Sequence, residues 1–178
     1  MTTIVGIAGS LRRASLNAAL LRAAVAAMPA GSVLEPASIA GIPLYDGDLE
    51  AAQGIPPAVT ALKERIAAAD GLLLVTPEYN NSIPGVLKNA IDWLSRPFGN
   101  GALKGKPLAV IGTALGQYGG VWAHDETRKS FGIAGPRVVE DLKLSVPAKS
   151  FDGKHPRENA EVGSALRDIV GKLAAEVA

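Results

Sequence analysis

The residues with the clearest chemical potential stand in one stretch near the N-terminus, Gly9-Ser10-Leu11-Arg12-Arg13-Ala14-Ser15-Leu16-Asn17. This stretch follows an apolar run and precedes a helical pattern, and a helix start offers free backbone N–H groups and the positive end of the helix dipole. Ser10, Ser15 and Asn17 can add hydrogen bonds to phosphate oxygens, while Arg12 supplies a charged bidentate donor. We therefore predict a phosphate site here. The alternative is a plain helix cap, in which Ser15 or Asn17 only begins the helix.

The spacing of glycines indicates which phosphate compound suits this turn. The dinucleotide pattern G-x-G-x-x-G is missing, because no glycine follows Gly9 before Asn17. The triphosphate loop G-x-x-x-x-G-K-[ST] is also absent. Gly105-Lys106 comes close to it, but Asn100 and Pro107 replace the first glycine and the hydroxyl residue. A mononucleotide is the better ligand.

A second polar turn, Pro77-Glu78-Tyr79-Asn80-Asn81-Ser82, follows the strongly apolar run 71–76. In an open parallel sheet, ligands bind beyond the carboxyl ends of the strands, where the strand order reverses. For the order 2-1-3-4-5 that point lies between strands one and three, which the two most polar turns follow. Tyr79 offers a ring for stacking, and Asn80 can match the edge of a flavin. The alternative is a turn before a helix that begins at Pro84.

A third turn, residues 113–120, is rich in glycine. Its backbone could approach a bound ring closely, and the start of the helix that follows could favour a reduced, anionic flavin. The alternative is a flexible loop.

Strand-like and helix-like patterns alternate along the chain and must position these turns. Apolar runs predict strands at 3–8, 32–38, 71–76, 107–113 and 137–144. Apolar residues at three- and four-residue spacing predict helices at 16–28, 56–69, 84–96, 119–131 and 162–177, and 41–54 is expected to be a surface loop. The pattern implies an α/β three-layer sandwich, a flavodoxin-like five-stranded parallel sheet with helices on both faces. No linker divides the chain, so residues 1–178 are predicted to form a single flavodoxin-like domain.

The composition limits the function further. The chain has 178 residues, a net charge of +1 and no cysteine, which excludes thiolate and iron–sulfur chemistry and argues against nucleic-acid binding. The two histidines, His124 and His155, lie far apart, so no metal site is expected. His124 and Asp125 are more typical of a solvated helix face than of acid–base chemistry. No basic leader or run of about 20 apolar residues is present, so we expect a cytoplasmic protein without a membrane partner.

Two strings of the chain resemble the NADPH-dependent FMN reductase family, which includes bacterial quinone and chromate reductases. The first runs from Gly9 to Asn17 and the second from Pro77 to Trp93. By this resemblance, the first turn would hold the FMN phosphate, the second would line the isoalloxazine and ribityl side, and the third would close the far edge. The predicted cofactor-binding residues are Ser10, Arg12, Ser15, Leu16, Asn17, Pro77, Glu78, Tyr79, Asn80, Ser82, Thr113, Gly116 and Gly119.

The resemblance implies an enzyme that binds FMN, takes hydride from NADPH or NADH and passes electrons to a small acceptor in a ping-pong sequence. Quinones, chromate and free flavin are the acceptors it suggests, and it also implies a homodimer or homotetramer. The chemistry would take place at the flavin N5 atom, so no side chain is assigned a catalytic role. Two alternatives stay open: a flavodoxin-like electron carrier, and a scaffold protein without cofactor.

Overall fold

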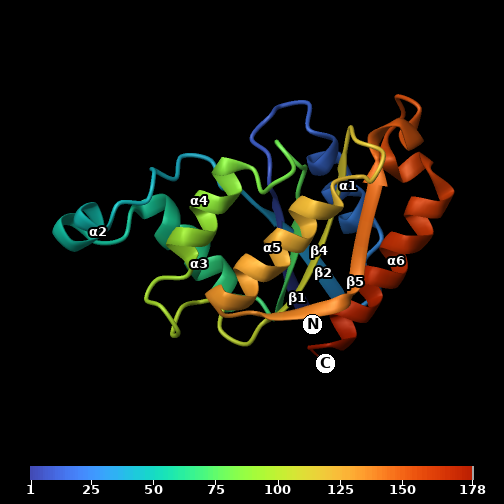
Figure 1. The fold of residues 1–178 in the computed structure, drawn as a ribbon. Helices are drawn as coiled ribbons and strands as arrows, with labels where there is room; N and C mark the ends of the chain where they lie inside the picture. The colour runs from blue at the N-terminus through green and yellow to red at the C-terminus, as the bar shows by residue number, and fades with distance from the viewer. Residues whose placement is uncertain (178) are drawn as a thin grey trace.

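Five strands form the centre of the structure, a computed structural model that describes residues 1–177 (Figure 1). The strands are β1 (Thr2–Ala8), β2 (Ser32–Ala37), β3 (Gly71–Val75), β4 (Pro107–Ala114) and β5 (Arg137–Pro147). The helices are α1 (Leu16–Ala26), α2 (Gly47–Gln53), α3 (Pro57–Ala68), α4 (Gly85–Leu94), α5 (Val121–Ala134) and α6 (Ala160–Ala175), with two 3-10 turns, η1 (Ala148–Phe151) and η2 (Pro156–Glu158).

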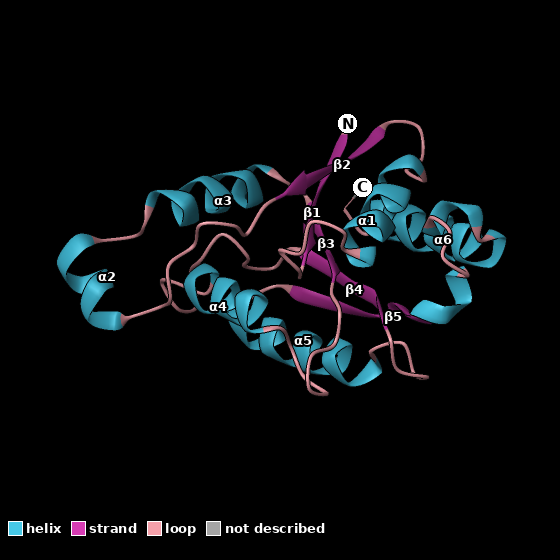
Figure 2. Cartoon of the chain, turned by 90° about the horizontal axis from the view of Figure 1, so that it is seen from above, coloured by secondary structure: helices cyan, strands magenta, loops and turns pink. Residues whose placement is uncertain are grey.

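The sheet has the order β2-β1-β3-β4-β5 and all its strands are parallel, which confirms the predicted topology. Alternate residues of a strand point to opposite faces. Leu73 and Val75 therefore pack with α1 and α6, while Leu72 and Leu74 pack with α3, α4 and α5. Figure 2 shows these helices on the two sides of the sheet. Each fully buried leucine contributes roughly 2 kcal/mol relative to an exposed one.

The segment predicted as a loop at 41–54 contains a helix, α2, which projects away from the sheet (Figure 1). None of its residues is buried, so no apolar stripe in the sequence marked it. Asp46 begins the helix because its carboxylate accepts hydrogen bonds from the N–H groups of Asp48 and Leu49, at 2.9 and 3.5 Å. The prediction of a loop was wrong here because capping, rather than an amphipathic face, makes this helix.

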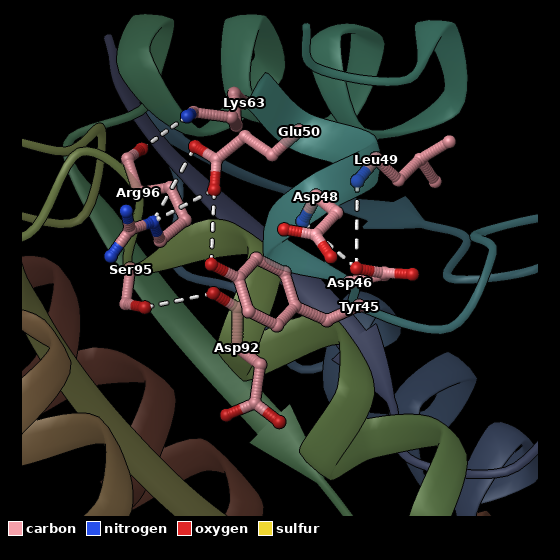
Figure 3. Close-up of polar contacts among 9 residues, drawn as sticks. All are labelled: Tyr45, Asp46, Asp48, Leu49, Glu50, Lys63, Asp92, Ser95 and Arg96. Atoms are coloured by element: carbon pink, nitrogen blue, oxygen red, sulfur yellow. Dashed lines mark hydrogen bonds and ion pairs between the residues drawn. The ribbon is translucent and has the colours of Figure 1, made fainter. Parts of the chain in front are cut away.

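A small cluster of side chains fastens this projecting segment to α4 (Figure 3). The Tyr45 hydroxyl donates to Glu50 at 3.0 Å, and Arg96 pairs with the same carboxylate at 3.1 Å. The Tyr45 ring also meets the buried Trp93 edge-on, with the ring centroids 4.9 Å apart. Half-buried charge and aromatic packing thus anchor residues that have little other contact with the core.

The last strand is longer than the predicted 137–144 and runs on to Pro147. Its pairing with β4 jumps from Leu108–Val138 to Val110–Lys143, so β5 carries several extra residues at this point. Beyond the irregularity the pairing resumes and places Ser145 beside Gly112. The end of β5 consequently lies next to the turn that follows β4. No helix within residues 1–177 is long and apolar enough to cross a membrane.

Candidate functional site

A cavity of about 210 Å³ lies at the carboxyl ends of β1, β3 and β4. Its walls come from all three turns that the sequence singled out. The lining residues are Ser10, Arg12, Ser15, Leu16, Asn17, Pro77, Glu78, Tyr79, Thr113, Ala114, Leu115, Gly116 and Ala148. A larger surface hollow of about 480 Å³ lies between α5 and β5, but no strand-end turn opens into it. Of the predicted site residues, only Asn80, Ser82 and Gly119 are outside the cavity lining.

The first turn presents hydrogen-bond donors and a cation to the cavity. Ser15 caps α1, because its hydroxyl accepts from the Ala18 N–H at 3.2 Å, so the capping interpretation is confirmed for this residue. Arg12 is exposed and forms no ion pair with any residue of the described range 1–177. The Ser10 hydroxyl lies 3.3 Å from the Tyr79 hydroxyl, which joins the first turn to the second. An unpaired guanidinium beside a helix N-terminus suits a phosphate.

Asn17 also lines the cavity, but its amide has a partner within the protein. Its Oδ1 accepts from the Thr113 N–H and its Nδ2 donates to the Thr113 carbonyl, both at 2.9 Å. The side chain is buried, and these two bonds tie the start of α1 to the end of β4. The sequence indicated a phosphate ligand at this position. The structure gives Asn17 a clamping role that its distance of 96 residues from Thr113 concealed.

The second turn is a tight hairpin whose tip lies outside the cavity. Tyr79 and Ser82 exchange backbone hydrogen bonds at 3.0 and 3.1 Å, and the two residues between them have positive φ values of 53° and 58°. Asparagine tolerates this left-handed conformation better than most residues, which explains Asn80 and Asn81. The Ser82 hydroxyl donates to Glu126 on α5. Asn80 and Ser82 therefore shape the turn, and the alternative of a turn before a helix describes them well.

Glu78 lines the cavity and also meets the start of α5. Its carboxylate accepts from the Ala123 N–H at 3.2 Å, and α5 has no side-chain cap of its own. One N–H group at the N-terminus of α5 thus already donates a hydrogen bond to a carboxylate. The expectation that this helix start favours an anionic flavin loses support for that reason.

The third turn reaches the cavity through Thr113 to Gly116, and Gly119 has a different role. A Cβ atom at Gly119 would lie 2.6 Å from the backbone nitrogen of Val146, and its φ is +65°. Only glycine lets the turn pass so close to β5. The Thr113 hydroxyl donates to the Val146 carbonyl at 2.6 Å, which continues this contact. Ala114 and Leu115 belong to the predicted third turn, although they were not named among its cofactor-binding residues. The sequence missed Ala148, which lines the cavity because β5 extends beyond Leu144.

His124 does not lie on a solvated face, so that prediction was wrong. The side chain is fully buried, and its Nε2 and Nδ1 atoms lie 2.8 Å from the Thr76 carbonyl and 2.7 Å from the Ser145 hydroxyl. Burial lowers the pKa of His124 to about 4; the hydrogen bond to Thr76 opposes this shift and the nearby charge of Arg128 adds to it. The ring is neutral at pH 7. Since a carbonyl only accepts, Nε2 carries the proton and Nδ1 accepts from Ser145.

The chemistry of the lining fits FMN. The lining includes Arg12, which has no counter-ion within residues 1–177, two serine hydroxyls and a helix start, as an anionic phosphate requires. It also includes a proline, an aromatic ring and the backbone of the third turn, as a flat heteroaromatic ring requires. Residues 1–177 contain no group of three or more His, Asp or Glu side chains that could hold a metal ion.

Comparison with known proteins agrees with this chemistry. Residues 2–150 match the family model described as NADPH-dependent FMN reductase. An NAD(P)H-dependent FMN reductase of Pseudomonas aeruginosa is 44% identical over 153 residues, which cover 85% of this chain and 82% of the relative. A 2-hydroxy-1,4-benzoquinone reductase of a Burkholderia species is 46% identical over 125 residues, covering 70% and 67%.

Among solved structures, the flavoenzyme NAD(P)H:(acceptor) oxidoreductase FerB of Paracoccus denitrificans superposes with a TM-score of 0.85 at 32% identity. The match covers 99% of this chain and 97% of that one. The family resemblance found in the two turns is thus confirmed over most of the chain. The protein belongs to the NADPH-dependent FMN reductase family.

Proposed function

We propose that this chain binds FMN in the cavity and uses it to pass electrons from NAD(P)H to quinones. The observation that carries the proposal is the meeting of two distant turns at the point where the strand order reverses. Ser10 and Tyr79 stand 69 residues apart in sequence, yet their hydroxyl groups lie 3.3 Å apart beside the unpaired Arg12. In an open parallel sheet, this is the place where a phosphate group and a flat ring can be held together.

The protein would supply binding and orientation for this reaction. Arg12, Ser10 and the N–H groups at the start of α1 would hold the phosphate. Two walls of the cavity, Pro77–Tyr79 and Thr113–Gly116, would line the ring. When bound, FMN would supply the redox chemistry, as the hydride acceptor for NAD(P)H and the electron donor for the quinone. No side chain is needed as an acid or base, and the neutral His124 lies beneath the cavity without a solvent path.

Other features of the chain are proposed from the fold and from the family resemblance. Residues 1–178 would act as one FMN-binding domain, since both core clusters share the same sheet. A homodimer or homotetramer, and chromate or free flavin as further acceptors, are proposed from the family resemblance alone. A cytoplasmic location is proposed because NAD(P)H is available inside cells.

Steady-state oxidation of NADPH by the purified protein tests the function. The protein is supplied with FMN and 1,4-benzoquinone, and the loss of NADPH absorbance is followed, with NADH in a parallel series. We expect turnover that depends on FMN and on the quinone. A non-catalytic carrier would take up FMN but oxidise almost no NADPH, and a scaffold protein would not take up FMN. Either result would refute the proposed enzyme.

Two adjacent arginines offer a matched pair of variants for the phosphate contact. Arg12 and Arg13 are both exposed, but only Arg12 lines the cavity. Arg12→Ala should weaken FMN binding by roughly tenfold to a hundredfold, because a charge-assisted hydrogen bond to phosphate is lost. Arg13→Ala carries the same charge change and should leave the affinity near the wild-type value. Equal affinities for the two variants would contradict the assignment of Arg12.

A further inference from the structure

His124 occupies an unusual position beneath the cavity. Its ring lies against β4 at Gly112, where a Cβ atom would be 2.5 Å from Nε2 and still closer to the Thr76 carbonyl oxygen. At Gly120 a Cβ atom would lie 3.1 Å from the same nitrogen. Glycine at both positions therefore leaves room for the imidazole. The ring fills a space between α5 and the ends of the strands, and no solvent reaches it.

The two ring nitrogens connect strands that are not neighbours in the sheet. Nε2 donates to the Thr76 carbonyl, one residue beyond β3, and Nδ1 accepts from Ser145 on β5. In the order β3-β4-β5, β4 separates these two partners. The β3–β4 pairing ends at Val75 and Ile111, so the carbonyl of Thr76 lies beyond the ladder and is bonded by His124. One side chain thus bridges across a strand.

Each partner of the ring leads directly to a different wall of the cavity. Thr76 precedes the wall that begins at Pro77. Ser145 precedes Val146, whose carbonyl accepts from the Thr113 hydroxyl at 2.6 Å, and Thr113 begins the wall formed by Thr113–Gly116. The Thr76 N–H already donates to the Ile111 carbonyl at 3.0 Å, and the contacts of His124 add a second link between the residues that lead into the two walls. Buried networks of this kind are rigid when every member is satisfied.

We propose that His124 is a positioning residue for the proposed flavin site, holding its two walls in register through Thr76 and Ser145. This inference rests on the proposed function, because it assigns both walls to one bound flavin. His124 would not touch the flavin or the acceptor. His124 would instead affect the affinity for the flavin and the polarity of the flavin's surroundings.

Three variants at two positions test the proposal. His124→Leu keeps much of the volume but removes both hydrogen bonds. His124→Gln restores them, because its amide N–H can donate to Thr76 while its amide oxygen accepts from Ser145. Ser145→Ala removes only the hydrogen-bond donor to Nδ1 of His124, and it replaces His124→Leu in the test if that variant does not fold. Leu62→Ala, a buried position on α3 outside the cavity lining, is the control for a general loss of stability.

The readouts are the affinity for FMN and the visible absorption spectrum of the bound flavin. We expect His124→Leu to weaken FMN binding by roughly tenfold or more and to shift the spectrum, because a buried carbonyl loses its donor and the wall moves. Ser145→Ala should change both readouts in the same direction and by less. His124→Gln should restore them, and Leu62→Ala should lower stability without moving the spectrum.

The proposal is overturned if His124→Leu, or Ser145→Ala in its place, binds FMN with the wild-type affinity and spectrum. It is also overturned if Leu62→Ala shifts the spectrum as much as His124→Leu does. Wild-type protein that fails to bind FMN would refute the proposed function itself, which is a separate outcome.

Discussion

Acid should destabilise this protein through His124 in particular. The ring is neutral when folded, and burial lowers its pKa from the ordinary 6.5 to about 4. The unfolded chain therefore takes up a proton below about pH 6.5, while the folded protein does so only near pH 4. Stability from this group is complete above pH 6.5, falls as the pH drops, and levels off near pH 4. At about 1.4 kcal/mol per pKa unit, the difference between the unfolded and folded pKa values of His124 corresponds to about 3 kcal/mol in the free energy of unfolding.

Urea unfolding measures this effect against a variant that cannot titrate. The wild type and His124→Gln are unfolded at about pH 7 and about pH 4.5, and the change in free energy between the two pH values is compared. The wild type and the variant have the same carboxylates, so the carboxylate contributions cancel when the two pH-dependent changes are subtracted. We expect the wild type to lose about 2 kcal/mol more than the variant over this range. Equal losses would show that the ring is not buried and neutral, and would refute the reasoning.

Two further predictions follow from the contacts around the cavity. Asn17→Leu leaves the buried N–H and carbonyl of Thr113 without partners and should lower the free energy of unfolding by about 3 kcal/mol. A urea midpoint equal to that of the wild type would contradict the clamp. Gly112→Ala places a Cβ atom 2.5 Å from the His124 ring, so we expect a marked drop in melting temperature. The control is Gly116→Ala, because a Cβ atom there meets no atom within 4 Å. Similar melting temperatures for the two glycine variants would contradict the close packing beneath the cavity.

The sheet and the place of the site could be predicted because short-range patterns encode them. Continuous apolar runs such as Leu72–Val75 can be buried only in a sheet covered on both faces, and alternation with helices implies parallel strands. The topology then brings the turns after β1 and β3 together. Arg12 and Tyr79 lie at one cavity, as this reasoning requires.

What could not be predicted depends on contacts between distant residues. The sequence around Asn17 predicts a phosphate ligand, but in the structure its amide is hydrogen-bonded to the backbone of Thr113. No local sequence pattern indicates that hydrogen bond. His124 has Asp125 and Glu126 beside it, which suggest a surface, yet it points between strands. Ala148 lines the cavity only because β5 runs past an irregularity that no residue pattern located. Each of these positions is defined by the tertiary structure.

The most direct test of the central claim compares the affinities of the wild-type protein for FMN and for riboflavin, measured by quenching of flavin fluorescence. Riboflavin keeps the ring but lacks the phosphate that Arg12 and the start of α1 would hold. The structure predicts that FMN binds at least about tenfold more tightly. Equal affinities, or no binding of either flavin, would contradict a cavity built from a phosphate turn and a ring turn.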